Sequence, residues 1–432
     1  MSLASPAVAA AATPANRWVM WAIPTALFVI AFFHRPAPGV IAKELMQTFS
    51  AGGAMIGMLS ATYFYTYAGL MIPAGVLLDT FGVRRVVSLG SAVMGVGALA
   101  MAVAPTEALL FAGRLAVGAG ATVTFVGALK VAGTWFAPSE FGTLTAITAT
   151  AGAMGAFVAT APLSWLVGLA GWRGAFLVVA VVTLAGAALC YGVVRDAGWA
   201  GAREGAATRA RAPRLRDVVT GMLEVVRNPH TWPPFFAFFF LYAAVGNMML
   251  WIIPYLRDVY GLERTEASMY AAATSLAVLA AGPLTGWLSD RIHCRRVPYI
   301  VLALALAVTW LAFVLTLGTL RLGGVSVLLF LMGAFGACFV LIWPIGREVN
   351  PPRLAGVAIA VVNFGGFLGA AVTQGPLGVL LDARWDGVLV AGARVYPLHA
   401  YRAAFGVCAA FVIASFVCGL FLKETSAHAA ES

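Results

Sequence analysis

Charged residues are scarce in this sequence. Only 10% of its 432 residues are charged, 62% are hydrophobic, and the mean hydropathy is +0.92. A soluble domain carries about 25% charged residues, so a water-soluble globule is excluded. The length leaves room for about 12 membrane spans of about 20 residues each with short loops. We therefore expect an all-α membrane protein.

Lysine and cysteine are also rare, and motifs for phosphate binding, metal binding and nucleophilic catalysis are missing. None of the three lysines follows a glycine, which excludes the usual phosphate-binding loop. The five cysteines are odd in number and lie in or beside apolar runs, which argues against a disulfide scaffold. No Cys/His cluster has metal-ligand spacing, and no Gly-x-Ser-x-Gly nucleophile motif occurs. We expect no enzyme, no metal and no cofactor. The net charge of +10 follows membrane orientation, so we expect no nucleic-acid partner.

Twelve apolar runs are present instead. Most are at least 18 residues long with few charges, which indicates membrane-spanning helices. None alternates in polarity as a barrel strand would. The predicted spans are Val19–Ile41, Ala54–Leu78, Val86–Val103, Ala108–Val131, Leu144–Leu169, Gly174–Val194, Trp232–Tyr255, Ala267–Ser289, Val297–Leu317, Val325–Ile345, Ala355–Leu381 and Ala403–Leu422.

The distribution of Lys and Arg predicts the orientation. With the N-terminus inside, cytoplasmic loops hold about twice as many as external ones, which places both termini in the cytoplasm of a bacterial inner membrane. An amphipathic stretch, Leu215–Val226, is expected on the membrane surface. The predicted parts are a tail (1–16), a six-helix bundle (17–195), a polar linker (196–231), a second six-helix bundle (232–423) and a tail (424–432).

One motif occurs in each half, displaced by 211 positions. A glycine precedes an aspartate by four residues at the cytoplasmic end of a helix, and two arginines follow. The glycine would let a neighbouring helix approach closely, and the aspartate would pair with arginines or a helix N-terminus. We expect a cytoplasmic gate, the alternative being a charge cluster that only sets topology. Its residues are Gly75, Asp79, Arg84, Arg85, Gly286, Asp290, Arg295 and Arg296.

These motifs resemble a known family. Gly75-x-Leu-x-Asp79-x-x-Gly-x-Arg84-Arg85 looks like the loop 2–3 signature of the major facilitator superfamily, and Arg114-Leu-Ala-Val-Gly-Ala-Gly is similar to its helix 4 motif. The resemblance implies a secondary transporter of two pseudo-symmetric six-helix bundles that works by alternating access. A helix 5 motif common in drug/proton antiporters is poorly matched.

Within that superfamily, Phe32-Phe33-His34-Arg35 and the segment 135–142 look like the anion:cation symporter and organophosphate transporter branches. That resemblance implies an organic anion contacted by Arg35. His34 stands where an acidic residue often precedes this arginine. The acidic residue that can follow the helix 4 arginine and the helix 7 arginine of the organophosphate branch have no counterpart.

Arg35 is the main binding candidate on physical grounds as well. An arginine inside a span is costly and is usually functional. Pro36 and Pro38 deprive the carbonyls of Phe32 and His34 of their helical partners, and broken backbone at this depth is tolerated beside a cavity. Arg35 can hold a carboxylate or phosphate with two hydrogen bonds. The alternative is an arginine that reaches the outer surface.

Other polar residues in the spans are supporting candidates. Arg114 would help to bind the anion or would hold helices 1 and 4 together through backbone carbonyls. His34 would carry a coupling proton or would only pack. The remaining candidates for the cavity lining, each with packing as the alternative, are Tyr63, Tyr67, Asn247, Asn363 and Gln374.

No acidic residue lies in the interior of a predicted span. A carboxylate-based ion site or a cationic substrate is therefore disfavoured. We expect a monomeric transporter of a small organic anion, working by uniport, by anion exchange, or by symport with a proton on His34 or on the substrate. Efflux of hydrophobic compounds and a non-transporting sensor with a transporter fold are the alternatives.

Overall fold

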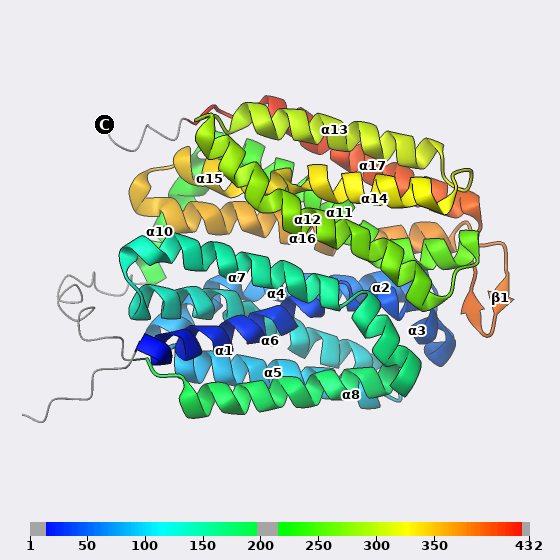
Figure 1. The fold of residues 1–432 in the computed structure, drawn as a ribbon, viewed down its shortest axis with the longest axis horizontal. Coiled ribbons are helices and arrows are strands. Elements are labelled where there is room, and N and C mark those ends of the chain that lie inside the picture. Colours follow the sequence, from blue (N-terminus) through cyan, green and yellow to red (C-terminus); the bar gives the residue numbers. More distant parts are fainter. Residues whose placement is uncertain (1–13, 197–214, 426–432) are drawn as a thin grey trace, which may run out of the picture.

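The computed structural model describes residues 14–196 and 215–425, which are almost entirely helical. Figure 1 shows two layers of helices, one from each half of the sequence. The first layer contains α1 (Pro14–Phe33), α2 (Ala37–Val40), α3 (Ala42–Phe49), α4 (Gly53–Phe81), α5 (Val83–Val103), α6 (Glu107–Trp135), α7 (Pro138–Val158) and α8 (Ala161–Val193).

The second layer follows the helix α10 (Leu215–Arg227). It contains α11 (Trp232–Tyr260), α12 (Arg264–Arg291), α13 (Arg296–Leu315), α14 (Leu322–Gly336), α15 (Ile342–Glu348), α16 (Ala355–Asp382) and α17 (Leu398–Leu420). Short 3-10 helices lie at Pro229–Thr231, Ala337–Leu341 and Pro352–Leu354. The unexpected strands β1 (Leu389–Val390) and β2 (Ala393–Arg394) form a small hairpin before α17.

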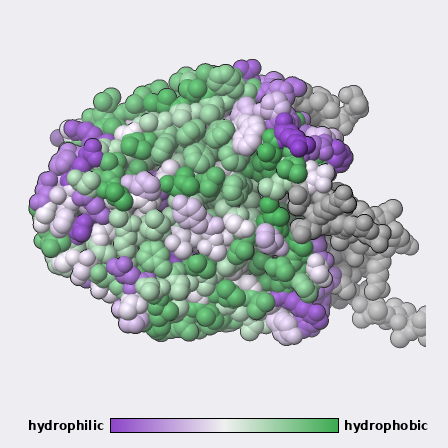
Figure 2. Space-filling view, turned by 180° about the vertical axis from the view of Figure 1, so that it is seen from behind, coloured by the Kyte–Doolittle hydropathy of each residue, from purple (hydrophilic) through white to green (hydrophobic). Residues whose placement is uncertain are grey.

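Twelve helical segments in the described part of the chain are long and apolar enough to cross a membrane. A broad apolar surface separates two polar ends (Figure 2). Leu89, Leu169 and Leu315 are 66–77% exposed on the protein, as expected of side chains that face lipid. The prediction of twelve spans is thereby confirmed. We call the end where α1 begins and α17 ends the terminal end, and the opposite end, with α3 and the hairpin, the distal end (Figure 1).

The predicted boundary between helices 5 and 6 is wrong. Instead of ending near Leu169, α7 ends at Val158. Pro162 cannot continue that helix because it lacks an N–H, but it fits the first turn of a new one. The new helix, α8, breaks at Gly171, whose φ of 69° is accessible to glycine at little cost.

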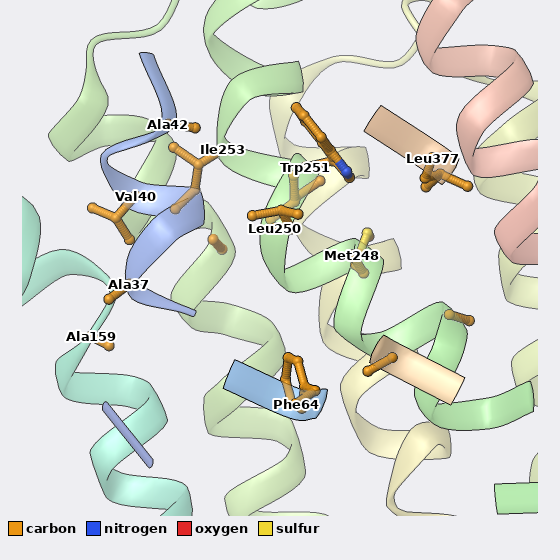
Figure 3. Packing of buried hydrophobic residues seen from close by; sticks show 14 of the residues in the cluster. Ala37, Val40, Ala42, Phe64, Ala159, Met248, Leu250, Trp251, Ile253 and Leu377 are labelled. Atoms are coloured by element: carbon orange, nitrogen blue, oxygen red, sulfur yellow. The ribbon is translucent and has the colours of Figure 1, made fainter. Parts of the chain in front are cut away.

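The first predicted span, Val19–Ile41, is interrupted after Phe33. Residues 34–36 form a turn before α2, and Pro36 and Pro38 account for the break. The short α2 packs on α11, where Ala37 and Val40 lie beside Leu250 and Ile253 (Figure 3). The backbones approach so closely that a Cβ on Gly39 would lie 2.5 Å from the carbonyl oxygen of Met249. The broken segment of the first half therefore rests on the second half.

The amphipathic stretch of the predicted linker is helical, as α10. Val225 on this helix is fully buried against Leu354 and Ala358. Glu224 also pairs with Arg353 at 2.5 Å. α10 is therefore packed against α16 of the second half.

Candidate functional site

Arg35 lies where the two halves meet. It is 7% exposed, and its Nη1 donates to the Tyr242 hydroxyl of α11 at 3.1 Å. No carboxylate of the described residues pairs with it, and its Nε has no partner within the protein. A buried guanidinium that donates to no protein carboxylate is chemically able to bind an anion.

Aromatic rings from both halves surround this guanidinium. Its carbon lies 3.7 Å from the ring centre of Phe32, 5.4 Å from that of Tyr67 and 5.0 Å from that of Phe367 on α16. Rings attract the cation without neutralising it. Tyr63 and Tyr67 share one face of α4, as expected, with their rings stacked 5.9 Å apart. Tyr242 and Phe367 were not among the sequence candidates, because no pattern in the sequence brings them to Arg35.

Arg114 is fully buried inside the first half. Its Nη1 donates to the backbone carbonyl of His34 at 2.7 Å, and its guanidinium lies 4.9 Å from the ring of Tyr63. The carbonyl that the proline break leaves free thus receives a donor from α6. The contact matches the alternative in which Arg114 holds the first and fourth spans, α1 and α6, together through a backbone carbonyl. Its Nε and Nη2 have no partner within the protein.

His34 points away from Arg35, into the first half. It is fully buried, its ring lies near those of Phe33 and Phe176, and neither ring nitrogen has a hydrogen-bond partner within the protein. A polar side chain in such surroundings is costly unless it is hydrogen-bonded.

The three amide candidates form contacts elsewhere. Asn247 donates to Thr373 and to the carbonyl of Ala243, and Gln374 donates to the carbonyl of Gly246. The Asn363 amide lies 3.6 Å from the sulfur of Met71, across the boundary between the halves. The structure shows no hydrogen bond from these three residues to Arg35.

The distal end is closed by charged side chains that join the halves. The Lys43 ammonium on α3 lies 2.6 Å from the carboxylate of Asp258 on α11, with side chains 5% and 4% exposed. It also donates to the backbone carbonyl of Arg394. Burial lowers the pKa of Lys43, and the Asp258 carboxylate offsets this only in part. Asp258 accepts further hydrogen bonds from the Tyr401 hydroxyl and the Tyr396 amide.

Glu44, the neighbour of Lys43, forms a second connection. One carboxylate oxygen contacts Arg257 at 3.1 Å and Arg264 at 2.9 Å. Arg264 also donates to the Ser164 side chain and carbonyl. Two adjacent residues of α3, Lys43 and Glu44, therefore pair with two adjacent residues of opposite charge on α11, Asp258 and Arg257.

Asp382 caps α4 from the other half. Its carboxylate accepts the backbone N–H groups of Gly53 and Ala54, both at 2.8 Å, and is held by Arg394 and Tyr396. A carboxylate at a helix N-terminus accepts from free backbone N–H groups and interacts favourably with the positive end of the helix dipole. We call these inter-half contacts, made by Lys43, Glu44, Gly53, Ser164, Arg257, Asp258, Arg264, Asp382 and Arg394, the distal seal.

Glycines permit the close crossing of α4 and α16 at this end. A Cβ on Gly57 would lie 2.2 Å from the carbonyl oxygen of Gln374, and one on Gly378 would lie 2.1 Å from that of Gly53. Any larger residue at either position would force the helices apart.

The glycines of the repeated motif, Gly75 and Gly286, do not show the close helix approach expected from the sequence. A Cβ on Gly75 or Gly286 would meet nothing within 4 Å. Asp79 pairs with Lys130, at 2.7 Å, and not with the following arginines as expected. Lys130 lies across from it on α6 of the same half.

The remaining gate candidates also bond within their own halves. Arg295 contacts Asp290 at 3.0 Å and Glu348 at 2.9 Å. Arg84 donates to the Tyr191 carbonyl, Arg296 donates to the Leu420 carbonyl, and Arg85 is exposed. Within residues 14–196 and 215–425, the hydrogen bonds and ion pairs between the halves lie at the distal end and at the level of Arg35 and Met71.

Comparisons agree with this architecture. The model of the Major Facilitator Superfamily matches residues 16–374, so the chain belongs to that superfamily. The probable galactarate/D-glucarate transporter GarP of Escherichia coli K12 is 23% identical, with 94% of each chain covered. The probable sulfoacetate transporter SauU of Cupriavidus necator is also 23% identical, over 62% of this chain and 64% of the relative.

A solved structure shares the fold. A bacterial homologue of the human lysosomal transporter Spinster, inward-facing and unoccupied, superposes with a TM-score of 0.79 at 17% identity, covering 95% of this chain and 98% of that one. The protein is thus a twelve-helix membrane transporter of two pseudo-symmetric bundles, and not an enzyme.

Proposed function

We propose that the protein moves a small organic anion across the bacterial inner membrane by alternating access, with Arg35 binding the anionic group. The observation that carries this proposal is the position of Arg35: buried, without a carboxylate partner, and bonded across the boundary to Tyr242. Both named relatives are probable transporters of organic anions. Arg114 supports the site by holding the His34 carbonyl beside Arg35.

The orientation follows from the charge distribution. With both termini in the cytoplasm, the distal seal closes the periplasmic side and the gate motifs face the cytoplasm without joining the halves. This structure then represents an inward-facing state. The two motifs would meet the opposite half when the cytoplasmic side closes. His34 would carry a coupled proton, or an exchanged anion would balance the charge.

Anion uptake into liposomes containing the purified protein tests the proposal. Arg35→Lys keeps the charge but loses the planar fork, and Arg35→Gln loses both. We expect Arg35→Gln to abolish anion-dependent flux and thermal stabilisation, and Arg35→Lys to retain a small part. Unchanged flux in a folded Arg35→Gln protein would refute the role of Arg35.

A second candidate, efflux of hydrophobic compounds, is favoured by the aromatic rings around Arg35. It predicts that neutral aromatic compounds compete as well as anions and that Arg35→Gln retains transport. Ligand binding without flux in any gradient would instead indicate a sensor.

A further inference from the structure

Aromatic side chains follow the path from the terminal end to Arg35. A cavity of about 340 Å³ at that end is lined by Trp343 and by the charged residues Asp290, Arg295 and Arg347, among others. Trp343 lies 6.0 Å from Phe238, which lies 5.5 Å from Tyr242, the partner of Arg35 (ring centres). In the second half, rings therefore run from Trp343 at this cavity to Tyr242 beside Arg35.

The first half presents rings as well. Phe28 lies 4.8 Å from Phe32 on α1 and 4.9 Å from Phe125 on α6. Phe32 is the ring closest to the Arg35 guanidinium. Phe32, Phe125, Tyr242 and Trp343 are each partly exposed, so they remain available to a ligand. Phe32 and Tyr242 thus bring rings from α1 and α11 to Arg35, and Phe125 on α6 and Trp343 on α15 belong to the same two ring clusters.

Polar partners for a ligand are few around Arg35. The Tyr63 hydroxyl donates to the carbonyl of Ala31, and the Tyr242 hydroxyl accepts from Arg35 itself. The Tyr67 hydroxyl also contacts Arg35. Gln374 is 1% exposed and donates to the carbonyl of Gly246, while its Oε1 has no partner within the protein, and the Asn363 amide faces a methionine sulfur. A ligand with several hydroxyl groups would find partners for few of them here, and each group that loses its water without gaining a partner costs about tenfold in affinity.

One cationic group is available. Arg114 is fully buried, lies against the ring of Tyr63 and is bonded to the His34 carbonyl, so it does not face the boundary between the halves. Of the described residues near Arg35, the only cation left for a second anionic group on the ligand is Arg114, whose Nε and Nη2 have no partner but which lies fully buried inside the first half.

We infer that the substrate is a monoanionic carboxylate with a compact aromatic or aliphatic body, and not a polyhydroxylated or dicarboxylic sugar acid. The inference rests on the proposed anion-transport function and goes beyond it by naming the body of the anion. The aromatic surroundings bind that body, while Arg35 binds its carboxylate.

Matched ligands test the charge and the body separately. Thermal stabilisation and liposome counterflow would be measured with benzoate, benzamide, cyclohexanecarboxylate, gluconate and glucarate. We expect benzoate and cyclohexanecarboxylate to bind at least about tenfold more tightly than gluconate or glucarate. Tighter binding of gluconate or glucarate would overturn the inference but leave the proposed function standing. Binding of benzamide equal to that of benzoate would overturn the proposed function itself, whereas no response to any of these anions would overturn the inference.

Variants locate the effect. Phe367→Leu removes a ring 5.0 Å from Arg35, and Phe330→Leu removes one that is 48% exposed on the outer surface. We expect Phe367→Leu to weaken benzoate several-fold more than cyclohexanecarboxylate, since a saturated ring gains less from aromatic contact. Phe330→Leu should change neither. Equal effects of the two variants would contradict a role for the rings around Arg35.

Discussion

Lys43 and Asp258 form an ion pair 2.6 Å long that joins the two halves of the protein with both side chains almost completely buried. Lys43 is only eight positions after Arg35, beyond the break in the first span. The chain that carries the proposed binding arginine thus continues directly into the distal seal. A movement of the backbone at Arg35 can therefore reach the distal seal through only eight residues of chain.

Removing one member of this pair should be costly. Asp258→Asn leaves the Lys43 ammonium buried without its carboxylate partner, and we expect a loss of about 3–5 kcal/mol in stability. Lys43→Met should cost less, because Asp258 keeps its bonds from Tyr396 and Tyr401. Denaturation of each variant and of the double variant checks this. A double variant as unstable as the sum of the two single ones would show that the pair is not coupled.

Gly57 and Gly75 on α4 should favour opposite states. Gly57→Ala cannot fit against Gln374 while the distal end is closed, whereas Gly75→Ala meets nothing in this structure. We expect Gly57→Ala to open the distal end, and Gly75→Ala to hinder closure of the terminal end.

Spin-label distances would test this in a background without the native cysteines. One label pair, Glu107 and Thr319, reports the distal end, and another, Thr80 and Arg291, reports the terminal end; all four residues are exposed. Longer distal distances in Gly57→Ala and unchanged ones in Gly75→Ala are expected. The reverse pattern would contradict the assignment of these glycines to the two ends.

Arg114 should support the site without contacting the substrate. Arg114→Gln is too short to keep the buried bond to the His34 carbonyl, which should cost about 1.5–3 kcal/mol in stability. Anion affinity should fall less than in Arg35→Gln. Calorimetric titration and thermal denaturation of both variants provide the measurement. An equal loss of affinity in both would place Arg114 in direct contact with the anion.

His34 should matter for coupling and not for binding. If its unpaired ring carries the transported proton, His34→Gln should abolish accumulation driven by a proton gradient while exchange of labelled for unlabelled anion continues. Both are measurable in the same liposomes. Gradient-driven accumulation that persists in His34→Gln would leave the substrate's own proton or anion exchange as the coupling mode.

The twelve spans, the two halves and the break beside Arg35 could be predicted from the sequence, because each depends on local properties. A long apolar run can satisfy its backbone only as a helix in lipid, and Pro36 and Pro38 break a helix wherever they occur. The repeated Gly-x-x-x-Asp motif likewise marks equivalent helix ends. Their pairing could not be predicted, since Lys130 lies in another helix and competes with nearby arginines for Asp79.

Contacts between the halves were decided only by the tertiary structure. Tyr242 and Phe367 reach Arg35 from more than 200 positions away, and nothing in their local sequence specifies this. The distal seal depends in the same way on Lys43 and Asp258 being brought together by the packing of α2 on α11. The sequence alone determined which residues could bind an anion or span the bilayer. The partners of these residues were set by how the two six-helix bundles pack against each other. Side-chain pairing across that boundary depends on the three-dimensional arrangement and not on neighbours in the chain.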